Sequence, residues 1–145
     1  QFKQEVAKKT EQWKKGSKLS AYNFNSGALK SALKAKPTTR ARQAAQLQAT
    51  FTISENPIAS AGKKVVYMQI QGPSGKTFQR MSSYLMETED GSVAYTEKKE
   101  IDYQNKAIDI SIYYDIREEN LSKGNYKVNI YCDENLIGSD SFTLK

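Results

Sequence analysis

Hydrophobic and polar residues alternate with a period of two along most of the chain beyond residue 46. Leu47, Ala49, Phe51 and Ile53 are separated by polar residues, which is the pattern of a strand with one buried face. Similar runs recur toward the C-terminus, and the cleanest alternation, at 108–114, predicts a central strand. With a weaker alternation at 19–24, the segments that predict strands are 47–53, 66–70, 77–85, 93–103, 108–114, 126–132 and 137–144. Their number and spacing predict a mainly β fold, an antiparallel β-sandwich of seven to nine strands.

The first residues follow a different period. Phe2, Val6 and Trp13 fall on one heptad seam, which a lysine interrupts, and such a seam is typical of a coiled coil. Two heptads are too short to form a stable helix alone. We therefore predict a short N-terminal helix at 1–17, the end of a longer coiled coil, followed by a sandwich domain at 18–145. Pairing through this helix would make the chain a homodimer.

Two local patterns near glycines predict turns. Gly72-Pro73-Ser74-Gly75 predicts a tight hairpin turn, because proline presets one φ and glycine allows a positive one. A phosphate-binding loop would need glycine where Ile70 stands, and a helix in place of the strand that follows. Tyr126 follows Gly124 with the spacing of the tyrosine corner of immunoglobulin-like domains, where the Tyr hydroxyl bonds to the preceding loop.

The residue types argue against catalysis. The chain has no histidine and one cysteine, so it lacks the commonest general base and cannot build a thiolate zinc site. Cys132 falls on the inward phase of its strand and is expected to be a small buried residue. The acidic residues at 87–90 and 118–119 lack the spacing of a calcium loop and are expected to be solvated. We therefore expect no enzymatic activity, no cofactor and no metal.

The charge is divided unevenly along the chain. The net charge is +6, and residues 1–42 hold eleven Lys and Arg against two Glu, while residues 43–145 hold eleven against fourteen Asp and Glu. A basic segment can bind nucleic acid, an anionic membrane or an acidic partner, or can simply keep the chain soluble. Lys36, Arg40 and Arg42 are its candidate partner-binding residues.

Tyrosine is the most informative excess, with nine residues. Tyr114 and Tyr126 fall on inward phases of their strands, whereas Tyr67 and Tyr113 fall on outward phases. An exposed tyrosine can anchor a partner, although tyrosine is also a good strand former. Tyr67 and Tyr113 are therefore the candidate partner-binding residues of the sheets.

One resemblance to a known family rests on strand and turn patterns: Leu47–Asn56, Ala61–Ile70, Gly72–Lys76, Gly124–Val128 and the basic Lys36–Arg42. These stretches resemble the C-terminal domain of uncharacterised bacterial proteins, often loosely labelled chromosome segregation proteins. Those proteins have an N-terminal membrane helix and a long coiled coil. The resemblance implies an immunoglobulin-like sandwich that includes residues 18–42, and a membrane helix in sequence missing from this chain.

Three functions follow as expectations. The first is a non-enzymatic interaction or spacer domain at the end of a membrane-anchored coiled-coil protein of the bacterial envelope, with a protein partner. The domain would then lie outside the cytoplasm, with a cytoplasmic location as the alternative. The second is a nucleic-acid-associated protein that uses the basic N-terminal segment. The third is a carbohydrate-binding sandwich, which would need a planar row of exposed aromatic residues.

Overall fold

The computed structural model describes residues 19–30, 36–79, 81–116 and 121–145, and within them the chain is mainly β. The predicted N-terminal helix and its seam residues Phe2, Val6 and Trp13 lie outside the described residues. The elements are β1 (Ala21–Leu29), β2 (Pro37–Thr38), a 3-10 turn (Ala41–Gln43), β3 (Gln46–Ile53), β4 (Gly62–Gln71), β5 (Leu85–Thr88), β6 (Gly91–Ala94), β7 (Glu97–Tyr103), β8 (Ile108–Asp115), β9 (Gly124–Cys132) and β10 (Asn135–Leu144).

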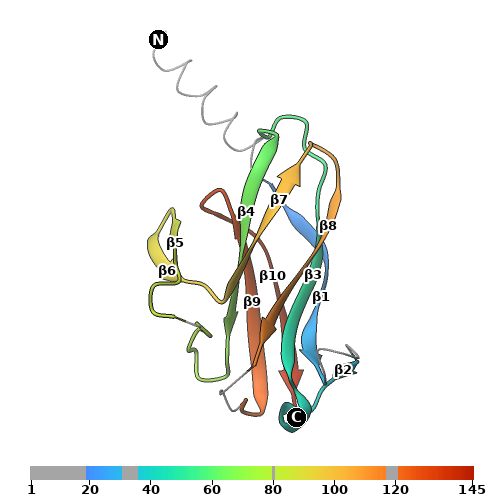
Figure 1. Ribbon diagram of the computed structural model, residues 1–145, viewed down its shortest axis with the longest axis vertical. Helices are drawn as coiled ribbons and strands as arrows, with labels where there is room; N and C mark the ends of the chain where they lie inside the picture. Colours follow the sequence, from blue (N-terminus) through green and yellow to red (C-terminus); the bar gives the residue numbers. More distant parts are fainter. Residues whose placement is uncertain (1–18, 31–35, 80, 117–120) are drawn as a thin grey trace, which may run out of the picture.

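Two antiparallel sheets of four strands pack face to face (Figure 1). Their orders are β2-β1-β3-β8 and β10-β9-β4-β7. The chain crosses between the sheets after β3, after β7 and after β8, so β3 pairs with β8 in one sheet while β4 pairs with β9 in the other. This interlocked pairing is that of an immunoglobulin-like sandwich. The predicted fold class is therefore confirmed in its β architecture, with ten strands in the described residues in place of seven to nine.

The predicted alternation becomes the interior of the sandwich. Most inward residues of β3, β8 and β9 are fully buried, and Leu47, Ile110 and Val128 are examples that are at most 3% exposed. Burying each such side chain contributes about 1.5–3 kcal/mol. Aromatic rings fill one end of the interior, where Phe78, Tyr126 and Phe142 stack with centroids 6.0 and 5.2 Å apart.

The tyrosine corner is confirmed. The Tyr126 hydroxyl donates to the backbone oxygen of Ser122 at 2.6 Å, and the ring is fully buried. Gly124 in the same loop has φ of 138°, and a Cβ there would lie 2.8 Å from the Cγ of Pro73. The corner therefore fixes the start of β9 against the turn that follows β4.

Two strand predictions were wrong. The prediction of a central strand at 108–114 fails because β8 is the last strand of its sheet. Clean alternation indicates only that one face of a strand is buried. An edge strand of a sandwich also has one buried face, because that face points to the interior. The predicted strand at 77–85 is only a single bridge, Gln71 to Thr77, that closes the confirmed turn at Gly72–Gly75.

Strand β1 and strand β10 lie side by side along one edge, where the two sheets meet. Ser26 donates to Asp140 at 2.6 Å across this edge. Just after β10, the Lys145 N–H donates to the Thr39 oxygen at 2.6 Å, and the Lys145 oxygen accepts from the Ala41 N–H at 2.9 Å. The basic segment 36–42 thus connects the end of β10 to β1.

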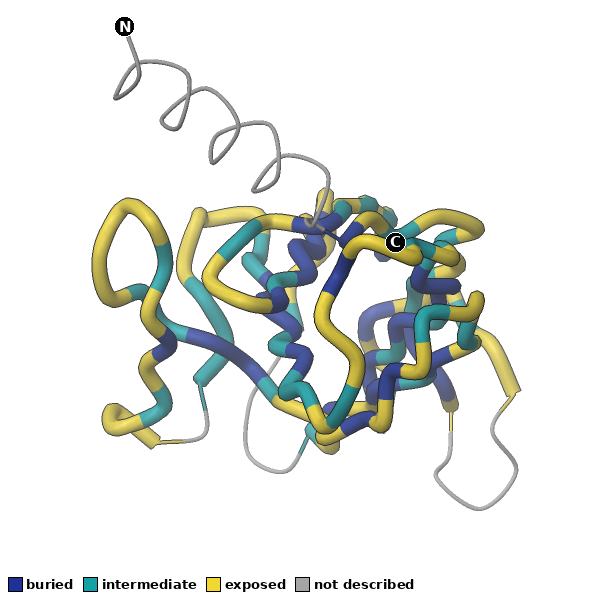
Figure 2. The backbone as a smooth tube through the Cα atoms, turned by 90° about the horizontal axis from the view of Figure 1, so that it is seen from above, coloured by how far each residue is buried: buried dark blue, intermediate teal, exposed yellow. Residues whose placement is uncertain are grey.

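The hairpin β5–β6 adds a third layer on one side only. It lies beside the sheet that contains β4 and β9 (Figure 1), and seen from above it remains on the left, outside both sheets (Figure 2). Buried Thr96 anchors it by accepting from the Ile70 N–H at 2.9 Å and donating to the Phe78 oxygen at 2.7 Å. At its tip, the Glu89 N–H bonds to the Glu134 oxygen at 3.3 Å.

Candidate functional site

The outer faces of the two sheets differ in what covers them. On the β4 and β9 side, the Gln69 amide donates to the Ala94 oxygen of the hairpin at 2.9 Å, and Gln69 and Asn129 are 6% and 8% exposed. On the other sheet, the outward residues of β1, β3 and β8 lie away from the hairpin, and most of them are exposed or half-buried, although Thr52 and Leu29 are 8% and 3% exposed. We call this surface the open face: it comprises Tyr22, Asn25, Gly27, Gln46, Gln48, Thr50, Thr52, Asp109, Ser111, Tyr113 and Asp115.

The strand register places these residues in rows. Tyr22 pairs with Thr52, which pairs with Asp109, and Gly27 pairs with Gln48, which pairs with Tyr113. The row between them is Asn25, Thr50 and Ser111. Neighbouring side chains on one face of a sheet lie about 5 Å apart across the strands. The open face therefore carries mainly polar side chains between Tyr22 and Tyr113, and a further row of Leu29, Gln46 and Asp115 lies beyond Tyr113.

Both tyrosines stand out from this face. Tyr22 and Tyr113 are each 45% exposed, although every other residue of the face is polar or is glycine. A tyrosine with this much apolar ring in water is a candidate anchor, because a partner that covers the ring recovers its hydrophobic burial.

The carboxylates of the face are engaged by neutral donors. Thr52 donates its hydroxyl to Asp109 at 2.6 Å, and the Gln46 amide donates to Asp115. Strands β1, β3 and β8 contain no Lys or Arg. One cation reaches the edge of the face from the neighbouring sheet, where the Lys99 ammonium donates to the Ser111 backbone oxygen at 3.0 Å. The open face is thus neutral to acidic on a chain whose net charge is +6.

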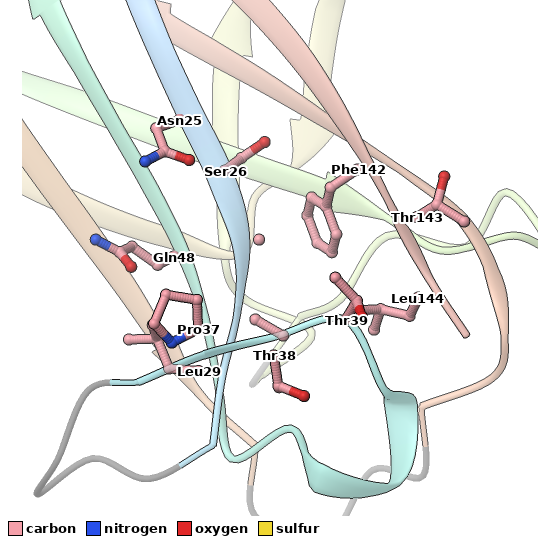
Figure 3. A pocket seen from close by; sticks show the side chains of 12 residues that line it. Asn25, Ser26, Leu29, Pro37, Thr38, Thr39, Gln48, Phe142, Thr143 and Leu144 are labelled. Carbon is pink, nitrogen blue, oxygen red and sulfur yellow. The ribbon is translucent and has the colours of Figure 1, made fainter.

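A cleft of about 170 Å³ opens beside the open face, between β1 and the end of β10 (Figure 3). Phe142 and Leu144 form its apolar wall and Pro37 and Thr38 its lower end, while Gln48 belongs to both the cleft and the face. A Cβ on Gly27 would meet no atom within 4 Å. The missing side chain leaves a depression next to Gln48.

The structure separates the two tyrosines that the sequence singled out. Tyr113 lies on the open face, whereas Tyr67 lies on the opposite sheet, half-buried, with its ring edge-on to Tyr95 at 4.9 Å. Tyr95 in turn stacks on Tyr84 at 5.1 Å. Tyr67 therefore contributes to packing of the third layer. The inward assignments of Tyr114 and Tyr126 are confirmed, since both are fully buried.

The basic candidates lie at the end of the sandwich, away from these rows. Lys36, Arg40 and Arg42 are exposed, and none forms an ion pair with another described residue. Arg40 lines an open hollow of about 450 Å³ with Lys30 and Thr39. Two basic side chains, those of Lys30 and Arg40, therefore line this hollow.

The remaining candidates have structural explanations. Cys132 is 1% exposed, and burial, followed by the charge of Asp133, raises the pKa of its thiol to about 12. Burial also raises the pKa of Tyr103. Glu87, Glu89 and Asp90 are exposed on the hairpin, and residues 118–119 lie outside the described residues. Over the described ranges, no three His, Cys, Asp or Glu residues gather in a way that could hold a metal ion.

Sequence reasoning missed most of the open face. Gln48, Thr50 and Thr52 were recognisable as the outward phase of a strand, but polar outward residues are common on any sheet. Tyr22 was hidden by the weak alternation at 19–24, where Asn23 with φ of 56° forms a bulge and breaks the period of two.

No helix in the described part of the chain has the length and apolar character needed to cross a bilayer.

The topology and the tyrosine corner define an immunoglobulin-like β-sandwich domain. Residues 20–145 match a family described as a domain of unknown function, DUF8428. This match covers most of the chain, and the chain therefore belongs to that family. A search of curated proteins finds no match.

Solved structures with related folds have low sequence identity. An alkylpurine DNA glycosylase from Pseudomonas fluorescens, bound to DNA with an abasic site analogue, is 14% identical with a TM-score of 0.48, over 89% of this chain and 31% of its own. A β-glucosidase from Kluyveromyces marxianus is 10% identical with a TM-score of 0.50, over 89% and 14%. An immunoglobulin-like protein from Pseudomonas aeruginosa is 14% identical with a TM-score of 0.45, over 90% and 98%. The chain spans less than a third of the first two proteins, and the similarity concerns the fold alone.

Proposed function

We propose that this chain is a non-enzymatic interaction domain that binds its partner through the open face. The observation that carries the proposal is the asymmetry of the two sheets. The hairpin covers the region of one outer face around Gln69 and Asn129, while the other outer face carries two tyrosines that are each 45% exposed. Exposed aromatic residues on a rigid sheet are a common basis for recognition.

The setting of the domain is proposed from the resemblance to membrane-anchored coiled-coil proteins. The domain would be the head, or a spacer, at the end of a coiled coil in the bacterial envelope, outside the cytoplasm. A homodimer through residues 1–17 belongs to the same proposal. Recovery of the full-length protein from the cytosol alone would contradict the anchored version.

Site-specific cross-linking tests the binding face. A photo-reactive benzoyl-phenylalanine at position 113 of the full-length protein, in its own cells, is expected to give a covalent adduct on irradiation. The matched control is position 85, where Leu85 is 54% exposed on the hairpin. Equal adducts at both positions, or none at 113, would reject the open face as the binding surface.

A second candidate function is association with nucleic acid through the basic end. The observation that favours it is the hollow lined by Lys30 and Arg40, with Lys36 and Arg42 exposed nearby in the sequence. Affinity for duplex or single-stranded DNA should then fall steeply with salt, and should fall further in an Arg40→Glu/Arg42→Glu variant. Absence of any gel shift at low salt would dismiss this candidate.

A further inference from the structure

We infer that the partner of the open face is a neutral glycan chain, which would run diagonally across the face from Tyr22 to Tyr113. The inference rests on the proposed function, because it names the class of partner for the same surface. Four properties of the face carry it: its aromatic corners, their separation, the groups between them and its charge.

The aromatic corners match the apolar face of a sugar ring. A pyranose presents several C–H groups on one side, and the electron-rich face of an aromatic ring attracts their partial positive charge. Tyr22 and Tyr113 are each 45% exposed, whereas the third large hydrophobic side chain on this side of the sheet, Leu29 beside Gln46, is only 3% exposed. A protein interface would be expected to add aliphatic or arginine anchors, and the described strands offer none here.

The separation of the tyrosines suits a chain of sugars. Tyr22 of β1 pairs with Thr52 of β3, and Tyr113 of β8 pairs with Gln48 of β3. The two tyrosines therefore lie two strands apart, and their partners lie four residues apart along β3. Strand spacing and rise then place their backbones about 17 Å apart. This distance is longer than a monosaccharide and is bridged by a short oligosaccharide.

The groups between the tyrosines are hydrogen-bonding groups that the domain leaves available. The side-chain amides of Asn25 and Gln48 and the hydroxyl of Ser111 form no hydrogen bond with another described residue. Amides and hydroxyls both donate and accept, as sugar hydroxyls do. The Thr50 hydroxyl is fixed by its bond to the Asn25 oxygen at 3.1 Å. The depression at Gly27 leaves space for a ring to reach Gln48.

The charge of the face disfavours an anionic partner. Strands β1, β3 and β8 have no Lys or Arg, whereas the chain as a whole has 22. The two carboxylates, Asp109 and Asp115, already accept from Thr52 and Gln46. A phosphate backbone or an anionic lipid would be repelled by these carboxylates and would find no cation on these strands. A polyhydroxylated neutral chain complements this face.

The test uses the 145-residue chain and soluble hexasaccharides of known linkage. Cellohexaose, chitohexaose and maltohexaose are titrated separately into the isotopically labelled protein, and amide shifts are followed by NMR. For at least one sugar, saturable shifts should be concentrated on β1, β3 and β8. Tyr22→Ala and Tyr113→Ala should each weaken that affinity about fivefold or more, while Tyr113→Phe should retain most of it. Leu85→Ala is the matched control, an exposed apolar side chain on the hairpin, and should not change the affinity.

Several outcomes overturn the inference. No saturable shift with any of the three sugars at millimolar concentration would reject it, and so would shifts that survive the Tyr22→Ala/Tyr113→Ala double variant. A protein adduct at position 113 in cells, combined with no sugar binding, would reject the glycan and keep the proposed function. The absence of both would reject the two together.

Discussion

The tyrosine corner shows how one side chain organises a loop. Tyr126 has a fully buried ring, stacked on Phe142, and a hydroxyl that donates to Ser122 in the loop before β9. Burial is the main cause that raises the pKa of this hydroxyl. The ring of Tyr126 packs in the interior, and its hydroxyl adds a hydrogen bond to the loop before β9.

Tyr126→Phe should keep the packing and lose that tie. We expect the free energy of unfolding to fall by about 1–2 kcal/mol, since a carbonyl at least partly buried loses its partner. Urea denaturation measures the change. Tyr113→Phe is the control, because its ring is 45% exposed and no described residue bonds its hydroxyl, so its effect should be close to zero.

The buried thiol makes stability depend on alkaline pH. The pKa of Cys132 is raised from 9.0 to about 12 in the folded chain, so the folded state retains its proton where the unfolded state loses it. This contribution is fully present below pH 9 and is lost as pH rises from about 9 toward 12. Unfolding free energies across this window should decline less steeply in Cys132→Ala than in the parent. Identical slopes would show that the thiol does not titrate as its burial requires.

At the scale of elements, glycines in the neighbouring strands β1 and β10 show opposite environments. A Cβ on Gly138 of β10 would lie 2.6 Å from Cε2 of Phe24 and closer still to its Cζ, whereas a Cβ on Gly27 of β1 would meet nothing within 4 Å. The Phe24 ring, stacked on Phe51 at 5.5 Å, therefore holds β1 against the backbone of β10.

Gly138→Ala should destabilise the domain by about 1–3 kcal/mol, because the ring must move from a packed position. Gly27→Ala should be neutral or stabilising by up to about 1 kcal/mol, since it only restricts the unfolded chain. Chemical denaturation of both variants under the same conditions makes the comparison. Equal effects would mean that the Phe24 contact does not restrain the edge.

At the scale of the whole molecule, the domain is two sheets with an added third layer. The sheets share an interior of many buried side chains. The hairpin β5–β6 has Met86 as its one buried residue, and it is held by Thr96, Gln69 and the contact at Glu134. Stability within a protein follows the density of such buried contacts. The hairpin should therefore open without unfolding the sheets.

Hydrogen exchange should resolve this order. Amides of β4 and β9, which are central in their sheet, should exchange slowest, through global unfolding. Amides of β5 and β6 should exchange faster by at least about tenfold, through local opening. Equal protection of the hairpin and β9 would indicate that all three layers unfold as one unit.

The sequence by itself determined most strands of the two sheets and which of their residues point inward. The period of two at 47–53 and 126–132 identified the residues that are buried, and the spacing of Tyr126 identified the corner, because both are local properties of the chain. The same reasoning excluded a phosphate loop at Gly72–Gly75. These features depend on neighbours only a few residues away.

Only the tertiary structure decided which outward residues are covered. Tyr67 and Tyr113 have the same outward phase in sequence, yet the Tyr95 ring packs against Tyr67, whereas Tyr113 remains 45% exposed. The edge position of β8 was decided in the same way. Whether an outward residue is covered depends on contacts between segments far apart in the chain, such as the hairpin and β4. The local period of hydrophobic residues does not predict such contacts. The open face is therefore a product of where the third layer packs.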